Sequence, residues 1–461
     1  MSNNSHLLTF VPYSKFSQWD VKQFFFEKIA SPFPIEKLGK HLIHQTEKVQ
    51  LSDYPETEFG ILGVSNKIGM FDADTVKGKS VSQKYHVVKD NWLAYNPYRI
   101  NVGSIGLKTS EQKGGYISPA YVVFSCKDTL LPEYMWLLMK TDTFNSIIKD
   151  STTGSVRQTL HFEKLADISA PIPSVPEQQK ILDKYHKLIK HAQQLVKDAD
   201  EALRQSLIDI QSQVSTYKCG MDEMSKKDSL LDIVSFTSTK RWEVDYIYKE
   251  SRIDAVVDSF TYPANNIDSL QKEFLFGLSV KASLDKKTGM IPVLRMSNIK
   301  NGNIDFDELK YLPYECAVTD KEPQKWLLEK GDFLVTRTNG SKDLVGKAAV
   351  FNGDDVYTYA SYLIRYRFDT NVVFPEYVNI MFMTALVREQ IAVMRRQGGG
   401  QYNLNSGEIN SIQIPLPPKD VQKDIINQFF KTRSLENELK CQAQQCVEEA
   451  VDYLENVLFS R

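Results

Sequence analysis

The chain has 461 residues, enough for about three domains at roughly 150 residues each, and 42% of them are hydrophobic. Its 56 Lys and Arg residues nearly balance 58 Asp and Glu residues, which excludes a histone-like polycation and an acidic disordered tail. A nucleic-acid partner would therefore have to be bound by local patches. The apolar runs are shorter than the roughly 18 to 20 residues of a membrane span, and the amino terminus shows no secretion signal, which predicts a cytoplasmic protein.

The first predicted element is a strand-rich globular domain over residues 1–172, in which runs of Val, Ile, Tyr, Phe and Thr are broken by Gly, Asn and Asp at short intervals. Along it follow five recognisable pieces: Trp19-Asp20-Val21, ILGVSN (61–66), Asn91-Trp92-Leu93-Ala94, Ser118-Pro119-Ala120-Tyr121 and Pro132-Glu133-Tyr134. The last piece predicts a helix start, because proline at the first helical position loses no hydrogen bond.

A long helix is predicted over 173–215, entered through the proline-rich turn PIPSVPEQQKIL (171–182). Apolar or small residues with a 4,3 spacing predict a coiled-coil seam: Ile181, Tyr185, Leu188, Ala192, Leu195, Ala199 and Ala202. A second stripe repeats every seven residues: Leu182, Ile189, Val196, Leu203 and Ile210. This face is wider than one partner helix covers, so more than one partner helix is predicted.

After a polar linker at 216–240, the plan is repeated in the same order, with a second domain over 241–416 and a second long helix over 417–461. The matching pieces are Trp242-Glu243-Val244, VLRMSN (293–298), Asp332-Phe333-Leu334-Val335, Tyr359-Ala360-Ser361-Tyr362, Pro375-Glu376-Tyr377 and PLPPKDVQKDII (415–426). The second helix carries its seam at Ile425, Phe429, Leu435, Leu439, Ala443, Cys446, Ala450, Leu454 and Val457. We predict an α+β fold: two mixed α/β domains separated by two long antiparallel coiled-coil helices, with an internal pseudo-two-fold repeat.

Chemical motifs are sparse. No phosphate-binding loop, nucleophile elbow or dinucleotide fingerprint occurs, and no cluster typical of a restriction nuclease is found. Cys441 and Cys446 lie five residues apart in a predicted helix, so their thiolates would not share a face. His41 and His44 lack a nearby acidic or Cys partner and are predicted to be surface histidines. We predict no metal site and no catalytic residue.

Polar loops at matching places in the two domains carry residue types that contact phosphates and base edges: YNPYRINVGSIGLKTSEQKGG (95–115) and TRTNGSKDLVGK (336–347). Glycine-rich turns beside Arg157-Gln158 and Arg395-Arg396 would let backbone approach phosphate closely. The candidate DNA contacts of the first domain are Asn96, Arg99, Asn101, Ser104, Lys108, Gln112, Lys113, Arg157 and Gln158. Those of the second are Arg295, Asn298, Arg337, Asn339, Ser341, Lys342, Lys347, Arg395, Arg396, Gln401 and Tyr402.

The duplicated order of YNPYRINVGSIGL, the Pro-Glu-Tyr helix start and the proline turn before Gln178 and Gln422 resembles the specificity subunit of type I restriction-modification systems. The resemblance covers nearly the whole chain, although the second copy has Asp420-Val421-Gln422 where Glu-Gln is usual and lacks an Asn-Pro-x-Arg loop.

The resemblance implies a non-catalytic subunit with two target-recognition domains, each reading a half-site of double-stranded DNA. It implies docking of two methyltransferase (modification) subunits and of motor-nuclease (restriction) subunits, which would bind S-adenosylmethionine, ATP and Mg, while this chain binds no cofactor. The expected partner-docking residues are Leu182, Leu188, Ile189, Leu195, Val196, Leu203, Leu435, Leu439, Val447 and Leu454. Two other classes stay open: a DNA-modifying enzyme carrying its own catalytic site, and a coiled-coil scaffold without a nucleic-acid role.

Overall fold

The computed structural model describes residues 29–66, 68–100, 103–151, 159–218, 244–318 and 324–459. The chain divides into two compact units, Met1–Val196 with Cys441–Arg461, and Lys197–Lys440. Each unit therefore contains one domain body together with half of each long helix, whereas the sequence analysis assigned the helices to segments of their own. Within the described part of the chain, no helix combines the length and the apolar composition needed to cross a membrane.

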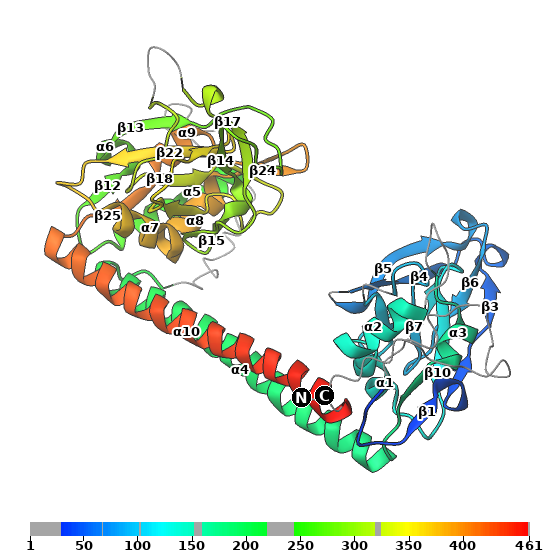
Figure 1. Cartoon of the computed structure of the whole chain (residues 1–461). Coiled ribbons are helices and arrows are strands. Elements are labelled where there is room, and N and C mark those ends of the chain that lie inside the picture. Colours follow the sequence, from blue (N-terminus) through cyan, green and yellow to red (C-terminus); the bar gives the residue numbers. More distant parts are fainter. Residues whose placement is uncertain are drawn as a thin grey trace, which may run out of the picture. The chain divides into compact units, whose positions relative to one another are not determined.

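The first unit is built on two sheets (Figure 1). A four-stranded sheet has the order β2 (Leu42–His44), β10 (Val122–Cys126), β7 (Leu93–Tyr95), β8 (Ile105–Leu107). A five-stranded sheet has the order β3 (Lys48–Gln50), β6 (Lys84–Val87), β9 (Tyr116–Ile117), β4 (Glu58–Ser65), β5 (Gly69–Lys77). The pair β1 (Ile35–Lys37) and β11 (Ser169–Pro171) and the helices α1 (Pro132–Leu138), α2 (Asp142–Ser151) and α3 (Phe162–Asp167) complete it.

Strand alternation produces two cores in the first unit, because successive side chains of a strand point to opposite faces. Leu93, Tyr95 and Phe124 belong to the core that also contains residues of the helices. Ala94 and Val123, their direct neighbours, lie in a smaller core shared with the five-stranded sheet. Both faces of the four-stranded sheet are thus covered, which explains its nearly continuous apolar strands.

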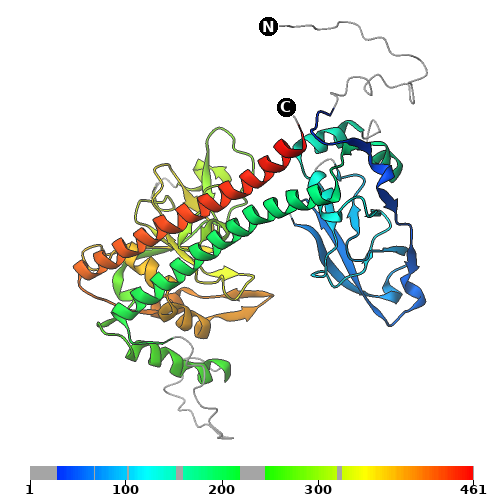
Figure 2. The same cartoon turned by 90° about the horizontal axis from the view of Figure 1, so that it is seen from below.

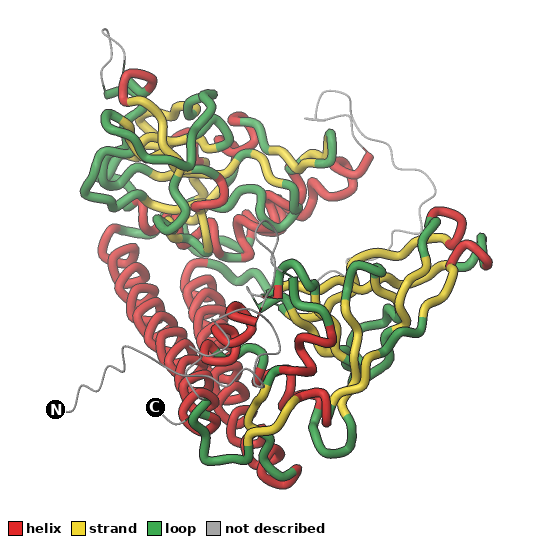
Figure 3. The backbone as a smooth tube through the Cα atoms, turned by 45° about the vertical axis from the view of Figure 1, so that its right-hand side comes forward, coloured by secondary structure: helices red, strands yellow, loops and turns green. Residues whose placement is uncertain are grey.

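The second unit repeats the four-stranded sheet with the order β13 (Gln271–Phe276), β22 (Leu363–Phe368), β18 (Phe333–Thr336), β20 (Ala348–Val350). Beside it lie three small groups: β17 (Lys310–Pro313), β14 (Met290–Leu294) and β21 (Thr358–Tyr359); β15 (Ile299–Lys300) and β16 (Asn303–Ile304); and β12 (Ala264–Asn266) with β25 (Gln413–Pro415). A further sheet joins β19 (Thr338–Asn339), β24 (Gln401–Asn403) and β23 (Arg396–Gly398). The helices of this body are α5 (Val244–Asp258), α6 (Ile267–Leu270), α7 (Pro375–Met383), α8 (Ala385–Met394) and α9 (Ser406–Ser411). Figure 3 colours the strands and helices of each body.

The structure corrects the register of the sequence repeat by one residue. Asn91 corresponds to Gly331 and not to Asp332: both have positive φ, at 66° and 90°, and their amides donate to the carbonyls of Lys108 and Phe351 at 2.9 Å. Leu93 therefore takes the place of Phe333, and each lies in the core beside the helices. A slip of one residue would turn every side chain of the strand to the opposite face.

The two long helices, α4 (Val175–Val214) and α10 (Lys419–Leu458), have 40 residues each, or about 60 Å at about 1.5 Å per residue. Within each unit its portions of α4 and α10 lie side by side (Figures 1 and 2). In the second unit the contacts run antiparallel: Asp200 pairs with Lys440 at 3.1 Å, Ser206 with Thr432 at 3.0 Å and Gln213 with Gln428 at 2.9 Å.

The predicted seam of α10 is wrong at one position. Leu435 is 47% exposed, and the buried positions are instead Arg433 and Glu436, whose side chains pair at 2.6 Å. Arg433 also stacks on the Phe429 ring at 5.2 Å, and Lys440 neutralises the second oxygen of Glu436 at 2.8 Å. An ion pair can thus occupy a buried seam position where hydrophobicity alone predicts a leucine.

The repeat extends to individual hydrogen bonds at the helix entries. The buried amide of Gln178 accepts from the Leu131 amide at 2.8 Å and donates to the carbonyls of Thr129 and Pro173 at 3.0 and 2.8 Å. Gln422 does the same in the second unit: it accepts from Phe374 at 3.0 Å and donates to Val372 and Pro417 at 3.1 and 2.9 Å. Each glutamine thus fixes the start of a long helix to the loop that precedes α1 or α7.

The far end of the other long helix contacts each body. The Glu455 carboxylate of α10 accepts from the amide of Asp142, and from Thr143 at 3.2 Å, at the start of α2. In the second unit Gln211 of α4 accepts from the Ala385 amide at the start of α8, at 3.1 Å. The amides at a helix start have no partner within the helix, and here a side chain of a long helix accepts from them. Together with the entry glutamines, these contacts attach each body to both long helices.

Candidate nucleic-acid interface

In the loop between β7 and β8, the described residues 96–100 are held by the side chain of Asn96. The Asn96 side chain accepts from the Tyr98 amide at 3.0 Å, and the Leu160 amide donates to the Pro97 carbonyl at 3.1 Å. Tyr98 and Arg99 are exposed on this loop. The backbone is therefore fixed while an aromatic ring and a guanidinium face solvent, as a DNA contact would require.

The next loop, 109–115, is anchored by two internal acceptors. The Gln112 amide oxygen accepts from the Thr109 amide at 2.8 Å, so Gln112 shapes the loop. The Asp72 carboxylate accepts from the amides of Lys113 and Gly114, at 3.1 and 2.7 Å, and these bonds hold the pKa of Asp72 below its ordinary value. The Lys113 side chain stays exposed.

Three predicted contacts are buried in the domains, and a fourth, Arg295, is half-buried and bonded to the main chain. Lys108 is 7% exposed, pairs with Asp90 at 2.5 Å and occupies the place that Phe351 fills in the second unit. Ser104 and Asn298 are buried, and Asn298 donates to the carbonyl of Asp305 at 2.9 Å. Arg295 donates to the Glu308 carbonyl at 3.0 Å. Lys108, Ser104 and Asn298 are therefore removed from the candidate surface, because burial and internal hydrogen bonds occupy them.

In the second unit the loop between β18 and β20 stands where the Asn96 loop stands in the first. The Ser341 amide donates to the Asn339 side chain at 3.1 Å, and Lys342 is exposed. Lys347, at the end of the loop, is half-buried, and burial together with the neighbouring Arg388 lowers its pKa.

A hairpin, β23–β24, pairs with the start of this loop. Gln397 lies opposite Tyr402 and Gly398 opposite Gln401, while Asn339 of β19 pairs with Tyr402 on the other side. Gly399 and Gly400 both have positive φ, at 60° and 75°, as a two-residue turn of this type demands. The hairpin is exposed from residue 396 to residue 401 and can be followed in Figure 1 by its label β24. A two-stranded ribbon of this size fits the major groove of DNA.

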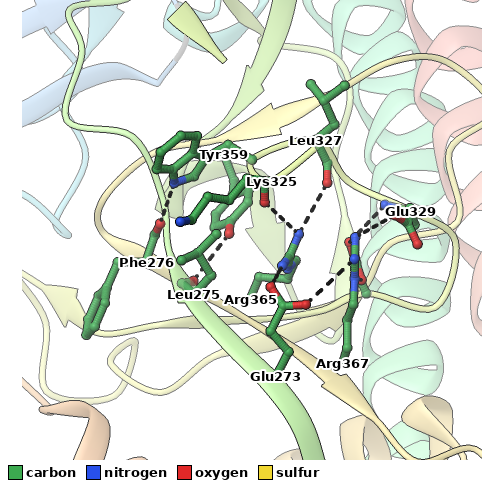
Figure 4. Close-up of polar contacts among 11 residues, drawn as sticks. Glu273, Leu275, Phe276, Lys325, Leu327, Glu329, Tyr359, Arg365 and Arg367 are labelled. Atoms are coloured by element: carbon green, nitrogen blue, oxygen red, sulfur yellow. Dashed lines mark hydrogen bonds and ion pairs between the residues drawn. The ribbon is translucent and has the colours of Figure 1, made fainter. Parts of the chain in front are cut away.

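Arg337, which opens the second loop, contacts Phe276, a member of a partly buried polar network drawn in Figure 4. Its guanidinium lies 5.3 Å from the ring centroid of Phe276, whose carbonyl accepts from Trp326 Nε1 at 3.2 Å. The segment with Trp326 is held in turn by Arg365, which is fully buried and donates to the carbonyls of Lys325 and Leu327 at 3.0 and 3.3 Å.

Acidic groups neutralise the arginines of this network. Glu273 pairs with Arg365, and Asp332 accepts from Arg367 at 2.7 and 3.2 Å, while Glu329 lies 2.9 Å from the same guanidinium. The sequence gives no signal for this network, because its members are spread over four separate segments.

Three predicted contacts, Asn101, Arg157 and Gln158, lie outside the described residues, as do Trp19 and Trp242 and most of the linker predicted at 216–240. The histidine prediction is wrong for His41, which is buried, with Nδ1 2.8 Å from Thr129 Oγ1 and Nε2 3.5 Å from Glu36. No group of three or more potential metal ligands occurs among the described residues, and Cys126, Cys316, Cys441 and Cys446 are free thiols.

The expected docking residues separate into three groups. Leu182 and Leu454 are buried in the core of the first unit, so they are unavailable to a partner. Leu188, Ile189, Leu195, Leu203 and Leu439 are half-buried. Val196, Leu435 and Val447 are exposed, and the structure adds Ile208, Phe430 and Val451, all between 37% and 50% exposed.

A family model described as the type I restriction modification DNA specificity domain matches residues 70–205 and 275–448. The chain belongs to this family. Each matched stretch runs from a domain body into α4 or α10, so the family unit comprises body and helix together.

Individual members of the specificity family are more distant. The chain is 31% identical over 163 residues to the type I restriction enzyme EcoKI specificity subunit of Escherichia coli (strain K12), a match that covers 35% of this chain and 34% of that protein. It is 26% identical over 165 residues to the StySPI specificity subunit of Salmonella potsdam, with 35% and 34% coverage. The chain thus spans about a third of the length of these relatives.

A solved chain, from work on complex assembly and conformational transition of the type I R-M system, is similar in fold. It is 13% identical, with a TM-score of 0.51, and the match covers 94% of this chain and 99% of that one. The predicted fold of the specificity family, two α/β bodies and two long helices in a duplicated order, is confirmed.

Proposed function

We propose that this chain is a sequence-specific DNA-recognition subunit of a type I restriction-modification complex, reading a bipartite site on double-stranded DNA. The observation that carries the proposal is the duplication itself. Two bodies present a fixed polar loop at the same place, after β7 and after β18, and each body is attached to both long helices. Two separate readers of half-sites fit this arrangement.

The partners follow from the exposed apolar residues of the helices. Val196, Val447 and Val451 lie in the first unit, and Ile208, Phe430 and Leu435 lie in the second. Three exposed apolar helix residues in each unit fit two copies of one partner. We therefore assign them to two methyltransferase (modification) subunits, joined by motor-nuclease (restriction) subunits in the complete complex, and acting on DNA in the cytoplasm.

The catalytic chemistry belongs, in this proposal, to the partners. S-adenosylmethionine would be bound by the modification subunits, and ATP and Mg by the restriction subunits, while this chain has no cofactor and no catalytic residue of its own. Methylation or cleavage would be directed by the position that the two bodies take on the site.

The deciding experiment is methylome sequencing of a strain that carries the chain with its modification subunit. The expected result is one bipartite methylated motif, which disappears when the gene for this chain is deleted. Replacing residues 1–172 by the corresponding domain of another family member should change one half of the motif and leave the other half intact. Methylation by the purified chain alone with S-adenosylmethionine would favour an enzyme, and an unchanged methylome after deletion would leave only a scaffold role.

A further inference from the structure

Arg388 of α8 and Arg395, which directly follows α8, hold the second candidate loop from behind. Arg388 donates to the carbonyls of Val345 and Asp343, at 3.1 and 3.0 Å. Arg395, which follows the helix, donates to the Lys342 carbonyl at 2.9 Å. Three main-chain oxygens of one short loop therefore point into the domain towards guanidinium groups, and the exposed Lys342 side chain is left towards solvent.

Arg395 also contacts the hairpin. Its guanidinium lies 5.8 Å from the ring centroid of Tyr402, the residue of β24 that pairs with Asn339 at the start of the loop. The sequence analysis assigned Arg395 to DNA contact, yet its side chain is only 22% exposed and is engaged with the loop and the hairpin. It lies where these two elements meet.

Helix α8, which carries Arg388 and precedes Arg395, is itself fixed at its start and in its middle. Gln211 of α4 accepts from the first amide of α8, at 3.1 Å. The buried side chain of Gln390 donates to the Gln413 carbonyl at 2.7 Å and accepts from the Gln413 amide at 2.9 Å. A side chain on such a platform holds its partner precisely, which is what a recognition surface requires of its supporting residues.

Charge adds to this geometry. Burial and the neighbouring Arg395 lower the pKa of Arg388, and Lys347 lies close enough for Arg388 to lower its pKa as well. Asp343 is the acidic group at this place, 4.0 Å from Arg395. Positive charge gathered beneath a loop attracts phosphate even where the charged groups do not touch it.

We propose that Arg388 and Arg395 are positioning residues for DNA recognition, which hold loop 339–346 and hairpin 396–403 together as one contact surface for a single half-site. The inference rests on the proposed function and makes it specific to the second domain. Helix α2, which corresponds to α8 in the first unit, has the sequence DTFNSIIKDS and contains no arginine. The two half-sites should therefore respond differently to these substitutions.

The test uses the full chain assembled with its modification subunits, on duplexes that carry the methylated motif of the wild type. Each base pair of either half-site is replaced in turn, and discrimination is the ratio of methylation rates on the intact and altered duplexes. Arg388→Met removes the two hydrogen bonds that Arg388 donates to the loop. Discrimination at one or more positions of the second half-site should fall by about tenfold, because a bidentate base contact supplies about that factor. Discrimination in the other half-site should stay within experimental error.

Arg395→Met provides a second test if Arg388→Met fails to fold. This variant loses the hydrogen bond to Lys342 and the contact with Tyr402. Arg388→Lys should recover only part of the discrimination, because one ammonium group cannot reproduce the fork of a guanidinium. Arg252→Met is the matched control, because Arg252 pairs with Glu389 of α8 at 2.7 Å. It should change discrimination in neither half-site.

Unchanged discrimination in the arginine variants, or an equal fall in both half-sites, would overturn the inference. The proposed function would still hold in that case, provided that the wild-type complex methylates a specific sequence. A wild-type complex without any sequence-specific methylation would overturn the proposed function instead.

Discussion

Removing the carboxylate of Glu273 should destabilise the second unit strongly. Arg365 is fully buried beneath it, while Glu273 itself is 45% exposed, so the two partners of this pair are not equivalent (Figure 4). In Glu273→Ala the guanidinium stays buried without its counter-charge. Breaking a buried pair in this way costs about 3–5 kcal/mol. The carbonyls of Lys325 and Leu327 still accept from Arg365, at 3.0 and 3.3 Å, so we expect the lower end, about 3 kcal/mol.

The assay is urea unfolding of the full chain, combined with hydrogen–deuterium exchange to locate the change. Amides of β18 and β22 should exchange faster in Glu273→Ala, whereas amides of β7 and β10 in the first unit should not. The matched control is Asp354→Asn, which removes an exposed ion pair with Lys330 at 2.5 Å and should change nothing measurable.

A double variant separates charge burial from packing. Glu273→Leu with Arg365→Met removes both charges, and it should be more stable than Glu273→Ala alone, because no uncompensated charge remains. If Glu273→Ala were as stable as the wild type, or if its faster exchange were spread over both units, the view that Arg365 depends on Glu273 would be refuted.

Three further predictions concern the recognition surface and the helices. Gly398 has a negative φ, and no atom lies within 4 Å of the position that a Cβ would take there, so Gly398→Val should leave the unfolding temperature unchanged or raise it. The same variant should slow methylation of the wild-type motif about tenfold or more, because the added side chain would obstruct DNA. Unimpaired methylation would show that DNA does not approach the hairpin there. Asp72→Asn should destabilise the first unit at neutral pH. Because the native pKa of Asp72 lies below the ordinary 3.8, the loss of stability relative to wild type is full above pH 3.8 and should vanish in thermal melts as the pH falls through the native pKa. A loss of stability that did not depend on pH would argue against the role of the carboxylate. We further expect the length of the two long helices to set the spacing between the half-sites. A seven-residue insertion after Lys190, matched by seven residues opposite it in α10, adds about 10 Å or about three base pairs, so methylome sequencing should show a longer spacer between unchanged half-sites. An active variant with the original spacer would contradict this expectation.

The order of elements could be predicted from the sequence because it occurs twice, and a duplicated order does not arise from surface composition. The register within the strands could not be predicted, because residue type aligns Asn91 with Asp332, whereas backbone conformation aligns it with Gly331. Asparagine and glycine share the left-handed region, and that shared property was the available signal. Lys108 was misassigned for the same reason: only the correct register shows that it stands at the position of the buried Phe351.

The candidate site could be located as loops but not resolved into roles. Lysine, arginine and asparagine are equally suited to contact DNA, to neutralise a buried carboxylate or to bind a carbonyl, and the sequence does not distinguish these uses. Arg388 was overlooked because it lies within a helix, 43 residues from the carbonyl that it binds. Such long-range pairings, like those of Asp72 and Glu455, arise only from the tertiary fold.

The participation of α10 in the first unit has a consequence for the timing of synthesis. Leu454, Leu458 and Phe459 belong to the same core as Ile181 and Leu182, so that core is complete only when residue 459 has been made. The whole second unit, Lys197–Lys440, is translated in between, which takes about 12 to 50 s at about 5–20 residues per second. During that interval the apolar face of the first body and of α4 lacks its cover. The body that is translated second can therefore finish folding first, while the apolar surface of the first body stays open to aggregation in the meantime.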